Sequence, residues 1–197
     1  KDSSIPLVML LRDVFGQAES KKMVENILQK GKVKIDGVVR KDSKFPVGLM
    51  DIITIEGTEK TSYRVLLKNE GLRFIKVPED EANLKLVKIT GKRTVKDGKY
   101  QYNFHDGNNI LSEDDYQTGS CLLIEVPDKE VKKEIELKEG NLAHITGGKH
   151  IGETNEIVKR IKNDEAENRV KLEGFETVEK NVYPIGEENP EVTLNGE

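Results

Sequence analysis

The apolar residues of this chain occur mainly in short runs interrupted by turn-forming residues, which restricts the fold to small elements. Beyond residue 57 the runs have the length and alternation of β-strands. Lys96-Asp97-Gly98-Lys99 marks a hairpin, and the segment EDEANL (79–84) fits a short helix. We therefore expect a β-rich central domain over residues 58–137. Its strand candidates are SYRVLL, LRFIKV, LKLVKIT, KYQYNF, SCLLIEV and EIEL.

Helical periodicity is concentrated in the first part of the chain. Pro6 suits a first helical turn, and Ser20 suits the N-cap of a second helix that ends near Gly31. The pattern then changes to alternation around an Asp36-Gly37 turn, which predicts a β-hairpin. We therefore expect residues 1–57 to form a module of two helices and a hairpin. The apolar faces of the two helices are Leu7, Leu10, Leu11 and Val14, and Met23, Val24, Ile27 and Leu28.

A glycine-rich segment begins the third part of the chain. Gly147, Gly148 and Gly152 permit a tight loop that carries Lys149 and His150. The spacing matches neither the dinucleotide-binding motif nor the P-loop, so we reject a nucleotide phosphate site. The short segments around this loop favour a small β-barrel over residues 138–186. We expect the acidic segment EENPEVTLNGE (187–197) to be a flexible tail.

Charge is distributed unevenly along the chain. The formal net charge is −4, yet residues 1–57 hold ten basic and eight acidic residues, whereas residues 138–197 hold eight and thirteen. Lysine and arginine on a helix edge and hairpin can contact phosphate oxygens, although an ordinary solvated face has the same composition. The candidate contacts are Arg12, Lys21, Lys22, Lys32, Lys34, Arg40, Lys41 and Lys44, with Lys149, His150, Lys159 and Arg160 on the barrel.

The sequence shows no convincing catalytic or metal-binding pattern. His105 and Asp106 are adjacent, but neighbours on a strand point to opposite faces, and Asp106-Gly107-Asn108 has turn chemistry. Three histidines without a metal-binding spacing and a single cysteine do not make a zinc site. We expect Cys121 to be a buried strand residue in a reducing compartment. We also expect no enzymatic activity, no cofactor, no metal, no small-molecule substrate and no membrane span.

Several segments, in order and together, resemble the small-subunit ribosomal protein family S4e of archaea and eukaryotes. They include SIPLVMLLRD, GKVKIDGVVRKDSKFPVGLMDIITI, YRVLL, EANLKLVKITGK, QYNFHDGNNIL, KEGNLAHITGGKHIG and NVYPIG, and they span nearly the whole chain. The resemblance implies an α+β, mostly β fold with an N-terminal S4-type RNA-binding module, a β-rich centre and a C-terminal KOW-type small SH3-like barrel.

The same resemblance implies a structural role in the small ribosomal subunit. The partners would be ribosomal RNA and neighbouring ribosomal proteins in the cytoplasm, and the role would be to support translation. An extra-ribosomal RNA-binding factor that uses the same module is the alternative.

Two features depart from the family pattern. A KOW-type loop has a second glycine shortly after the position of Gly152, and Asn155 stands near that place. Because asparagine tolerates left-handed backbone, we expect the turn to persist. Family members also carry a basic N-terminal extension ahead of SIPL. Either this lineage lacks the extension or this sequence omits it, and we favour the second explanation. A missing basic segment would also explain why the pI is only about 5.6.

Overall fold

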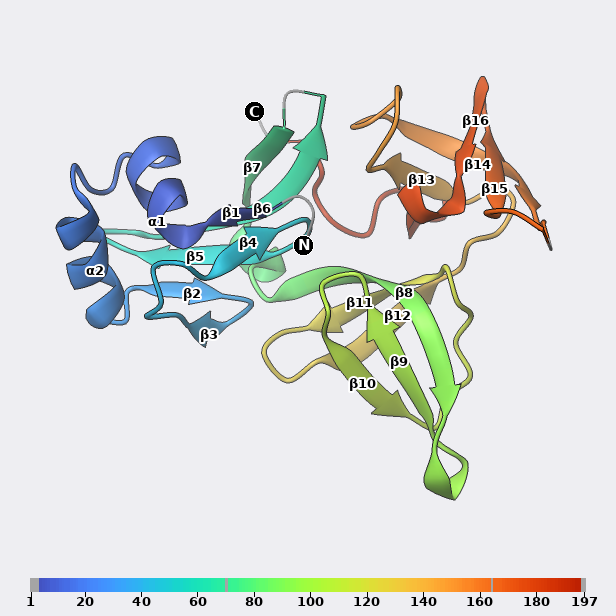
Figure 1. Ribbon diagram of the computed structural model, residues 1–197, viewed down its shortest axis with the longest axis horizontal. Coiled ribbons are helices and arrows are strands. Elements are labelled where there is room, and N and C mark those ends of the chain that lie inside the picture. Colours follow the sequence, from blue (N-terminus) through green and yellow to red (C-terminus); the bar gives the residue numbers. More distant parts are fainter. Residues whose placement is uncertain (1–3, 70, 164, 196–197) are drawn as a thin grey trace.

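The computed structural model of the chain describes residues 4–69, 71–163 and 165–195 (Figure 1). The described residues form three five-stranded sheets and one two-stranded sheet, and every strand pair is antiparallel. Helical segments are short and lie mainly in the N-terminal part. The fold is therefore α+β and mostly β, as the sequence predicted.

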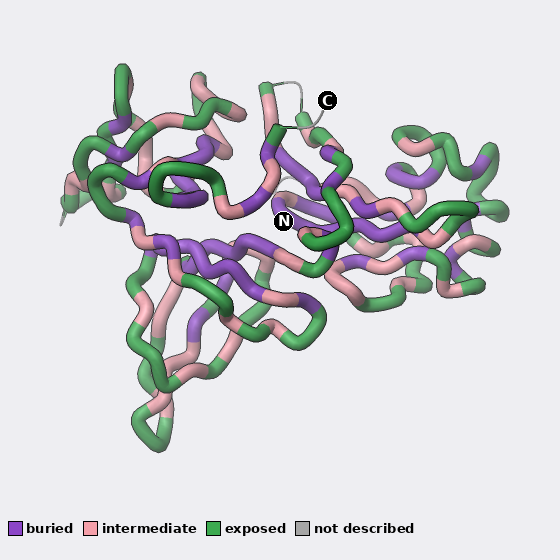
Figure 2. Tube along the Cα trace, turned by 180° about the vertical axis from the view of Figure 1, so that it is seen from behind, coloured by how far each residue is buried: buried purple, intermediate pink, exposed green. Residues whose placement is uncertain are grey.

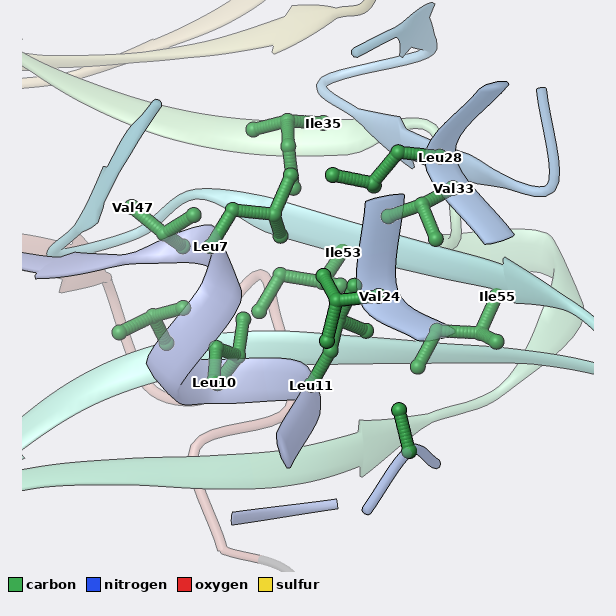
Figure 3. Close-up of a cluster of buried hydrophobic side chains, with 12 residues drawn as sticks. Leu7, Leu10, Leu11, Val24, Leu28, Val33, Ile35, Val47, Ile53 and Ile55 are labelled. Carbon is green, nitrogen blue, oxygen red and sulfur yellow. The ribbon is translucent and has the colours of Figure 1, made fainter. Parts of the chain in front are cut away.

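The N-terminal helices cover one face of a sheet. The Ser20 hydroxyl accepts a hydrogen bond from the Met23 backbone N–H at 3.3 Å, as expected of the N-cap. Figure 3 shows the apolar side chains of both helices directed at those of the sheet, so helix and sheet share one core. The helical segments are α1 (Leu7–Met9), the π-helical turn η1 (Leu10–Val14) that continues it, and α2 (Lys21–Gln29).

The N-terminal sheet has the order β3-β2-β5-β6-β7, and β1 pairs with β4 beside it. It continues past residue 57, where the change of periodicity suggested a boundary, because β5 and β6 form a hairpin. The sheet therefore includes segments that the sequence analysis assigned to the central domain. The strands are β1 (Ser4–Pro6), β2 (Val33–Ile35), β3 (Val38–Val39), β4 (Pro46–Gly48), β5 (Ile52–Glu56), β6 (Lys60–Lys68) and β7 (Gly71–Val77).

The central sheet has the order β10-β9-β8-β11-β12. A 3-10 turn, η2 (Glu79–Glu81), precedes it where a short helix was expected, and η3 (Lys96–Gly98) forms the predicted hairpin turn. Strand β10 was not predicted, and it extends the sheet beyond β9. The strands are β8 (Leu84–Thr94), β9 (Tyr100–Phe104), β10 (Asn109–Ser112), β11 (Cys121–Glu125) and β12 (Glu130–Ile135).

The third sheet has the order β16-β15-β14-β13-β17 and encloses a small core of its own. Register shifts on β13 and β14 let the strands curve, as a small barrel requires. The elements are β13 (Leu142–Ile145), β14 (Thr154–Ile161), β15 (Arg169–Leu172), β16 (Phe175–Val178), the 3-10 turn η4 (Glu179–Asn181) and β17 (Val182–Gly186).

Another apolar cluster joins all three parts at the middle of the molecule, where Figure 2 shows the buried segments meeting. Leu66 of β6, Leu86 of β8 and Ile185 of β17 contribute to it. Val192 and Leu194 from the C-terminal segment complete it, with 2% and 6% of their surface exposed. The expectation of a flexible tail over residues 187–197 is therefore wrong for the described residues up to 195, because these two apolar side chains anchor the segment.

Two further expectations concern single features. Cys121 is fully buried, as predicted, and burial raises the pKa of its thiol to about 12. Within the described residues, each helix is too short or too polar to cross a lipid bilayer.

Candidate nucleic-acid interface

The first candidate cations lie on the outward side of α2. Val24 and Leu28 are buried against the core of the N-terminal module, so Lys21 and Lys22 on the other side are exposed. The Lys21 ammonium lies 3.6 Å from Glu25, one helical turn on, and such exposed pairs contribute little to stability. Within the described chain, Lys22 has no carboxylate partner.

The hairpin that follows α2 alternates between the core and solvent. Val33 and Ile35 are buried, whereas Lys32, just before β2, is exposed. The Lys34 ammonium lies 2.7 Å from the Glu56 carboxylate on β5, and this hydrogen bond and charge lower the pKa of Glu56. Lys34 is therefore paired, and Lys32 is the unpaired cation of the hairpin among the described residues.

The turn of the hairpin is the predicted Asp36-Gly37 pair. Both residues have positive φ, 51° and 74°, as a tight two-residue hairpin turn requires. A Cβ on Gly37 would lie 2.9 Å from the Pro127 side chain in the β11–β12 connection. The hairpin tip is therefore packed against the central domain, and the N-terminal module cannot swing freely.

The segment after β3 holds three more candidates. The Arg40 guanidinium lies 4.3 Å from the centre of the Phe45 ring, a cation–π contact. Phe45 packs on the module core, so Arg40 is held half-buried. Lys41 and Lys44 are exposed, and neither has an ion-pair partner in the described residues. The Asp42 side chain accepts a hydrogen bond from the Lys44 backbone N–H at 2.8 Å, which fixes the turn.

Arg12 differs from these lysines because it forms an ion pair with its neighbour Asp13. Its Nε and Nη2 donate to the two Asp13 carboxylate oxygens at 2.6 and 2.9 Å. The side-chain hydrogen bond and the charge of Arg12 hold the pKa of the Asp13 carboxyl below its usual range. Arg12 is exposed, but its guanidinium is paired with the Asp13 carboxylate.

We call the exposed lysines of this module that lack an ion-pair partner among the described residues the basic edge. Lys30 belongs to it and was missed by the sequence analysis, although its place between α2 and Gly31 is a signal that could have found it. The basic edge consists of Lys22, Lys30, Lys32, Lys41 and Lys44.

The barrel candidates occupy different environments. Lys149 is exposed at the tip of the β13–β14 loop. The His150 imidazole stacks on the Phe175 ring with 3.8 Å between ring centres and 12° between the planes. Its Nδ1 lies 3.1 Å from a Glu153 carboxylate oxygen. His150 is thus positioned by two neighbours, whereas Lys149 has no partner in the described chain.

Lys159 and Arg160 are adjacent on β14 but differ in their contacts. Lys159 is exposed and lies opposite Lys171 of β15. The Arg160 guanidinium donates to both Glu179 carboxylate oxygens at 2.8 and 2.7 Å, and to the Thr118 carbonyl at 3.3 Å. The structure therefore favours Arg160 as a contact between barrel and central domain, not as a phosphate ligand.

The two groups of candidates do not form one surface. Figure 1 shows α2 and the β2–β3 hairpin at one end of the molecule and the barrel at the other side, with the central sheet below both. An RNA that touches both groups must therefore span the molecule.

A buried lysine fixes this arrangement, and sequence analysis missed it. Lys85 on β8 is 1% exposed, and its ammonium lies 2.6 Å from Asp36, 2.8 Å from Asp51 and 2.8 Å from Asp106. Oxygens of the three carboxylates lie within 4.8 Å of one another, and the Lys85 ammonium contacts all three. Asp36 and Asp51 belong to the N-terminal module and Asp106 to the central domain. The cluster therefore joins the two parts.

Burial and the Lys85 charge act in opposite directions on the carboxyl groups of this cluster. Burial disfavours the Lys85 ammonium, but the attraction of the three carboxylates outweighs it and raises its pKa. Burial also disfavours the Asp106 carboxylate, yet the Lys85 charge and hydrogen bonds from Lys85 and Asn108 lower its pKa well below the usual range. Burial, together with the charge of Asp51, instead raises the pKa of Asp36 against the opposing attraction of Lys85. The site therefore holds the Lys85 ammonium beside an ionised Asp106 carboxylate.

His105 and Asp106 serve structural contacts. Asp106 accepts a hydrogen bond from the Asn108 backbone N–H at 2.9 Å, so it does form the predicted turn, but its bond to Lys85 gives it a second role. The His105 ring accepts from the Lys88 backbone N–H at 3.2 Å, and its other nitrogen lies 3.2 Å from the Leu49 carbonyl. Both ring nitrogens are engaged, and burial lowers the pKa of His105.

Two further buried cations bind the remaining parts together. The Lys88 ammonium donates to the carbonyls of Glu179 and Val182, at 2.5 and 2.7 Å, and so ties β8 to the barrel. Arg64 donates to Glu81 at 2.8 Å and to the Thr193 carbonyl at 2.7 Å. These contacts link the N-terminal sheet, the central domain and the C-terminal segment.

Sequence comparison is consistent with this layout. A profile of ribosomal family S4e matches residues 59–131, and an S4 domain profile matches residues 7–53. Small ribosomal subunit protein eS4 of Methanosphaera stadtmanae is 41% identical over 100% of this chain and 83% of its own length. The chain belongs to ribosomal family S4e. The S4e protein eS4 of Archaeoglobus fulgidus is 43% identical, over 94% of this chain and 80% of its own length.

A solved S4e structure has the same fold. The crystal structure of 30S ribosomal protein S4e from Thermoplasma acidophilum superimposes with a TM-score of 0.83 at 33% identity, and covers 99% of this chain and 100% of that one. The loop between β13 and β14 forms, and it does so without left-handed backbone at Asn155, which lies in β14 opposite Ala143. The positive φ angles fall on Gly148 and Gly152, at 83° and 89°.

Proposed function

We propose that this S4e chain is a structural constituent of the small ribosomal subunit that binds ribosomal RNA through its basic edge. Neighbouring ribosomal proteins are its other partners, and it acts in the cytoplasm to support translation. The observation that carries the proposal is a folded S4-type module with five exposed lysines, those of the basic edge, that lack ion-pair partners among the described residues.

Lysines of this kind suit the RNA backbone. Each ammonium that approaches a phosphate releases a condensed counterion, so affinity falls as salt concentration rises. The bases of a double-stranded RNA helix are hard to reach, so such helices are recognised mainly through backbone and shape. The basic edge would therefore position the protein on RNA, with base reading secondary.

The proposal assigns the chain no catalytic role. Both ring nitrogens of His105 are occupied by backbone groups, and Asp106 is bound to Lys85. Neither side chain has a free atom directed at a reacting group, and their contacts explain them as parts of the fold.

The test compares two pairs of exposed cations in binding to small-subunit ribosomal RNA across salt concentrations. Lys41→Ala with Lys44→Ala should lower affinity and flatten the slope of log affinity against log salt by about 1.4 to 1.8, at roughly 0.7 to 0.9 per contact. Arg93→Ala with Lys96→Ala is the matched control, because both side chains are exposed and have no ion-pair partner in the described chain. Equal losses from both pairs would refute a privileged basic edge.

Sedimentation separates this function from the extra-ribosomal alternative. In sucrose-gradient fractions that contain small subunits, a ribosomal constituent should be present at one copy for each ribosomal RNA molecule. An accessory factor should be substoichiometric and should leave the particles at moderate salt.

A further inference from the structure

The face-to-face contact between His150 and Phe175 leaves one aromatic surface open. Phe175 covers one side of the imidazole at 3.8 Å, and 33% of the His150 side chain is exposed to solvent. Its Nδ1 lies against Glu153, so that nitrogen is not available to a phosphate. A ligand can therefore reach the imidazole only on the surface that Phe175 and Glu153 leave exposed.

The loop that carries His150 is held in place on two sides. The Thr146 backbone N–H donates to the Asn181 carbonyl at 2.9 Å, and a Cβ on Gly147 would lie 2.6 Å from the Asn181 side chain. On the other side, a Cβ on Gly152 would lie 3.1 Å from the Lys68 side chain of β6. The loop is therefore ordered before any ligand arrives, which reduces the entropy lost on binding.

We infer that the His150–Phe175 pair is a stacking platform for an unpaired base of ribosomal RNA, with Lys149 beside it to contact a phosphate. This inference rests on the proposed function and adds a second, chemically different contact to it. A base inside an RNA duplex is stacked on its neighbours, so only an unpaired base can lie on the imidazole face. Every base has such a face, so the platform is tolerant of sequence.

Lys149 favours RNA over a protein side chain as the occupant. It is exposed next to His150 and has no ion-pair partner in the described chain. The Glu153 carboxylate contacts His150 at the ring edge, on Nδ1. A base on the ring face with its phosphate toward Lys149 satisfies both groups.

Stacking and phosphate contacts respond differently to salt, which provides the test. Binding to small-subunit ribosomal RNA is measured at several salt concentrations for His150→Ala, His150→Phe and Lys149→Ala. His150→Ala should weaken binding roughly 5- to 150-fold at every salt concentration, with the slope unchanged. His150→Phe should retain wild-type affinity, because an aromatic face remains. Lys149→Ala should flatten the slope by about 0.7 to 0.9.

Several outcomes would overturn the platform. They are wild-type RNA affinity in His150→Ala, a flattened slope of log affinity against log salt in that variant, or equal losses of RNA affinity in His150→Phe and His150→Ala. Normal RNA affinity with poor incorporation into subunits would assign the face to a protein partner instead. If His150→Ala melts early, His150→Leu replaces it, since leucine fills the space without an aromatic face. If the His150 variants contradict the platform while the Lys41 and Lys44 variant still shows the expected loss of affinity, the proposed function remains supported.

Discussion

The Asp36 carboxylate at the tip of the N-terminal hairpin lies 2.6 Å from the Lys85 ammonium on strand β8. The two residues are far apart in the sequence and belong to different parts of the fold. Because Lys85 also binds Asp51 and Asp106, one buried cation joins the S4-type module to the central sheet.

Replacing Lys85 with methionine should be strongly destabilising. Lys85→Met keeps the length of the side chain but leaves three carboxylates close together without their counterion. Breaking a buried pair in this way costs about 3 to 5 kcal/mol, which urea denaturation should report as a lower midpoint. Lys132→Met is the control, since its pairs with Glu125 and Glu130 are exposed and should matter by less than about 1 kcal/mol. Similar losses in both variants would disprove a special role for the cluster.

The neighbours Lys159 and Arg160 should show opposite effects. Arg160→Gln removes hydrogen bonds to Glu179 and should lower the free energy of unfolding by about 1.5 to 3 kcal/mol. It should leave the salt dependence of RNA binding unchanged. Lys159→Ala should preserve stability, and if Lys159 contacts phosphate it should flatten the salt slope by about 0.7 to 0.9. Thermal melting and RNA titration of both variants check this, and a flattened slope in Arg160→Gln would contradict it.

His144 should make the protein less stable in acid. Burial, together with the charge of Lys68, lowers its pKa to about 4, whereas an unfolded histidine titrates near 6.5. Between these values the unfolded chain binds the extra proton, so stability rises with pH across this window. The stability that the uncharged, buried His144 contributes is fully present above about pH 6.5, and it is lost as the pH falls from there to about 4.

The size of this effect is roughly 3 kcal/mol, since each pKa unit corresponds to about 1.4 kcal/mol. The difference in unfolding free energy between wild type and His144→Gln, measured from pH 4 to pH 7, should change by that amount. Using the difference removes the titration of carboxylates common to both proteins. Parallel curves would show that His144 does not titrate in this window.

Leu194 should be part of the core despite its place near the end of the chain. It is 6% exposed in the cluster shared by all three parts, so Leu194→Ala should cost about 2 to 5 kcal/mol. The exposed neighbour gives a control, because Asn195→Ala should change stability by less than about 0.5 kcal/mol. A flexible tail would instead make the two variants indistinguishable in chemical denaturation.

Local patterns predicted the elements well, because each depends on residues close in sequence. The Ser20 N-cap and the Asp36-Gly37 turn formed as expected. Strand pairing was harder, since alternation identifies a strand but not its neighbour. The continuation of the N-terminal sheet into β6 and β7 was missed for this reason. Strand β10 was missed because Asn109–Ser112 is short and begins with a residue of low strand propensity.

The buried charges could not be found from sequence. Lys85 and Lys88 stand in the segment LKLVKIT, where a lysine normally indicates the solvent face of a strand. Their burial depends on partners such as Asp36 and Glu179, which folding brings from distant parts of the chain. The charge pattern did locate the lysines of the N-terminal module, but it could not distinguish Lys159 from the paired Arg160.

Strand β8 holds the N-terminal module through Lys85 and the barrel through Lys88, three positions further on. The spacing between the basic edge and the His150 loop is therefore set when the protein folds. If both surfaces contact RNA, the protein is a rigid bivalent ligand, and its second contact forms at a high effective concentration only when the RNA presents both sites at the matching distance. Two individually weak and sequence-tolerant contacts would then discriminate a correctly folded RNA from a misfolded one with the same sequence.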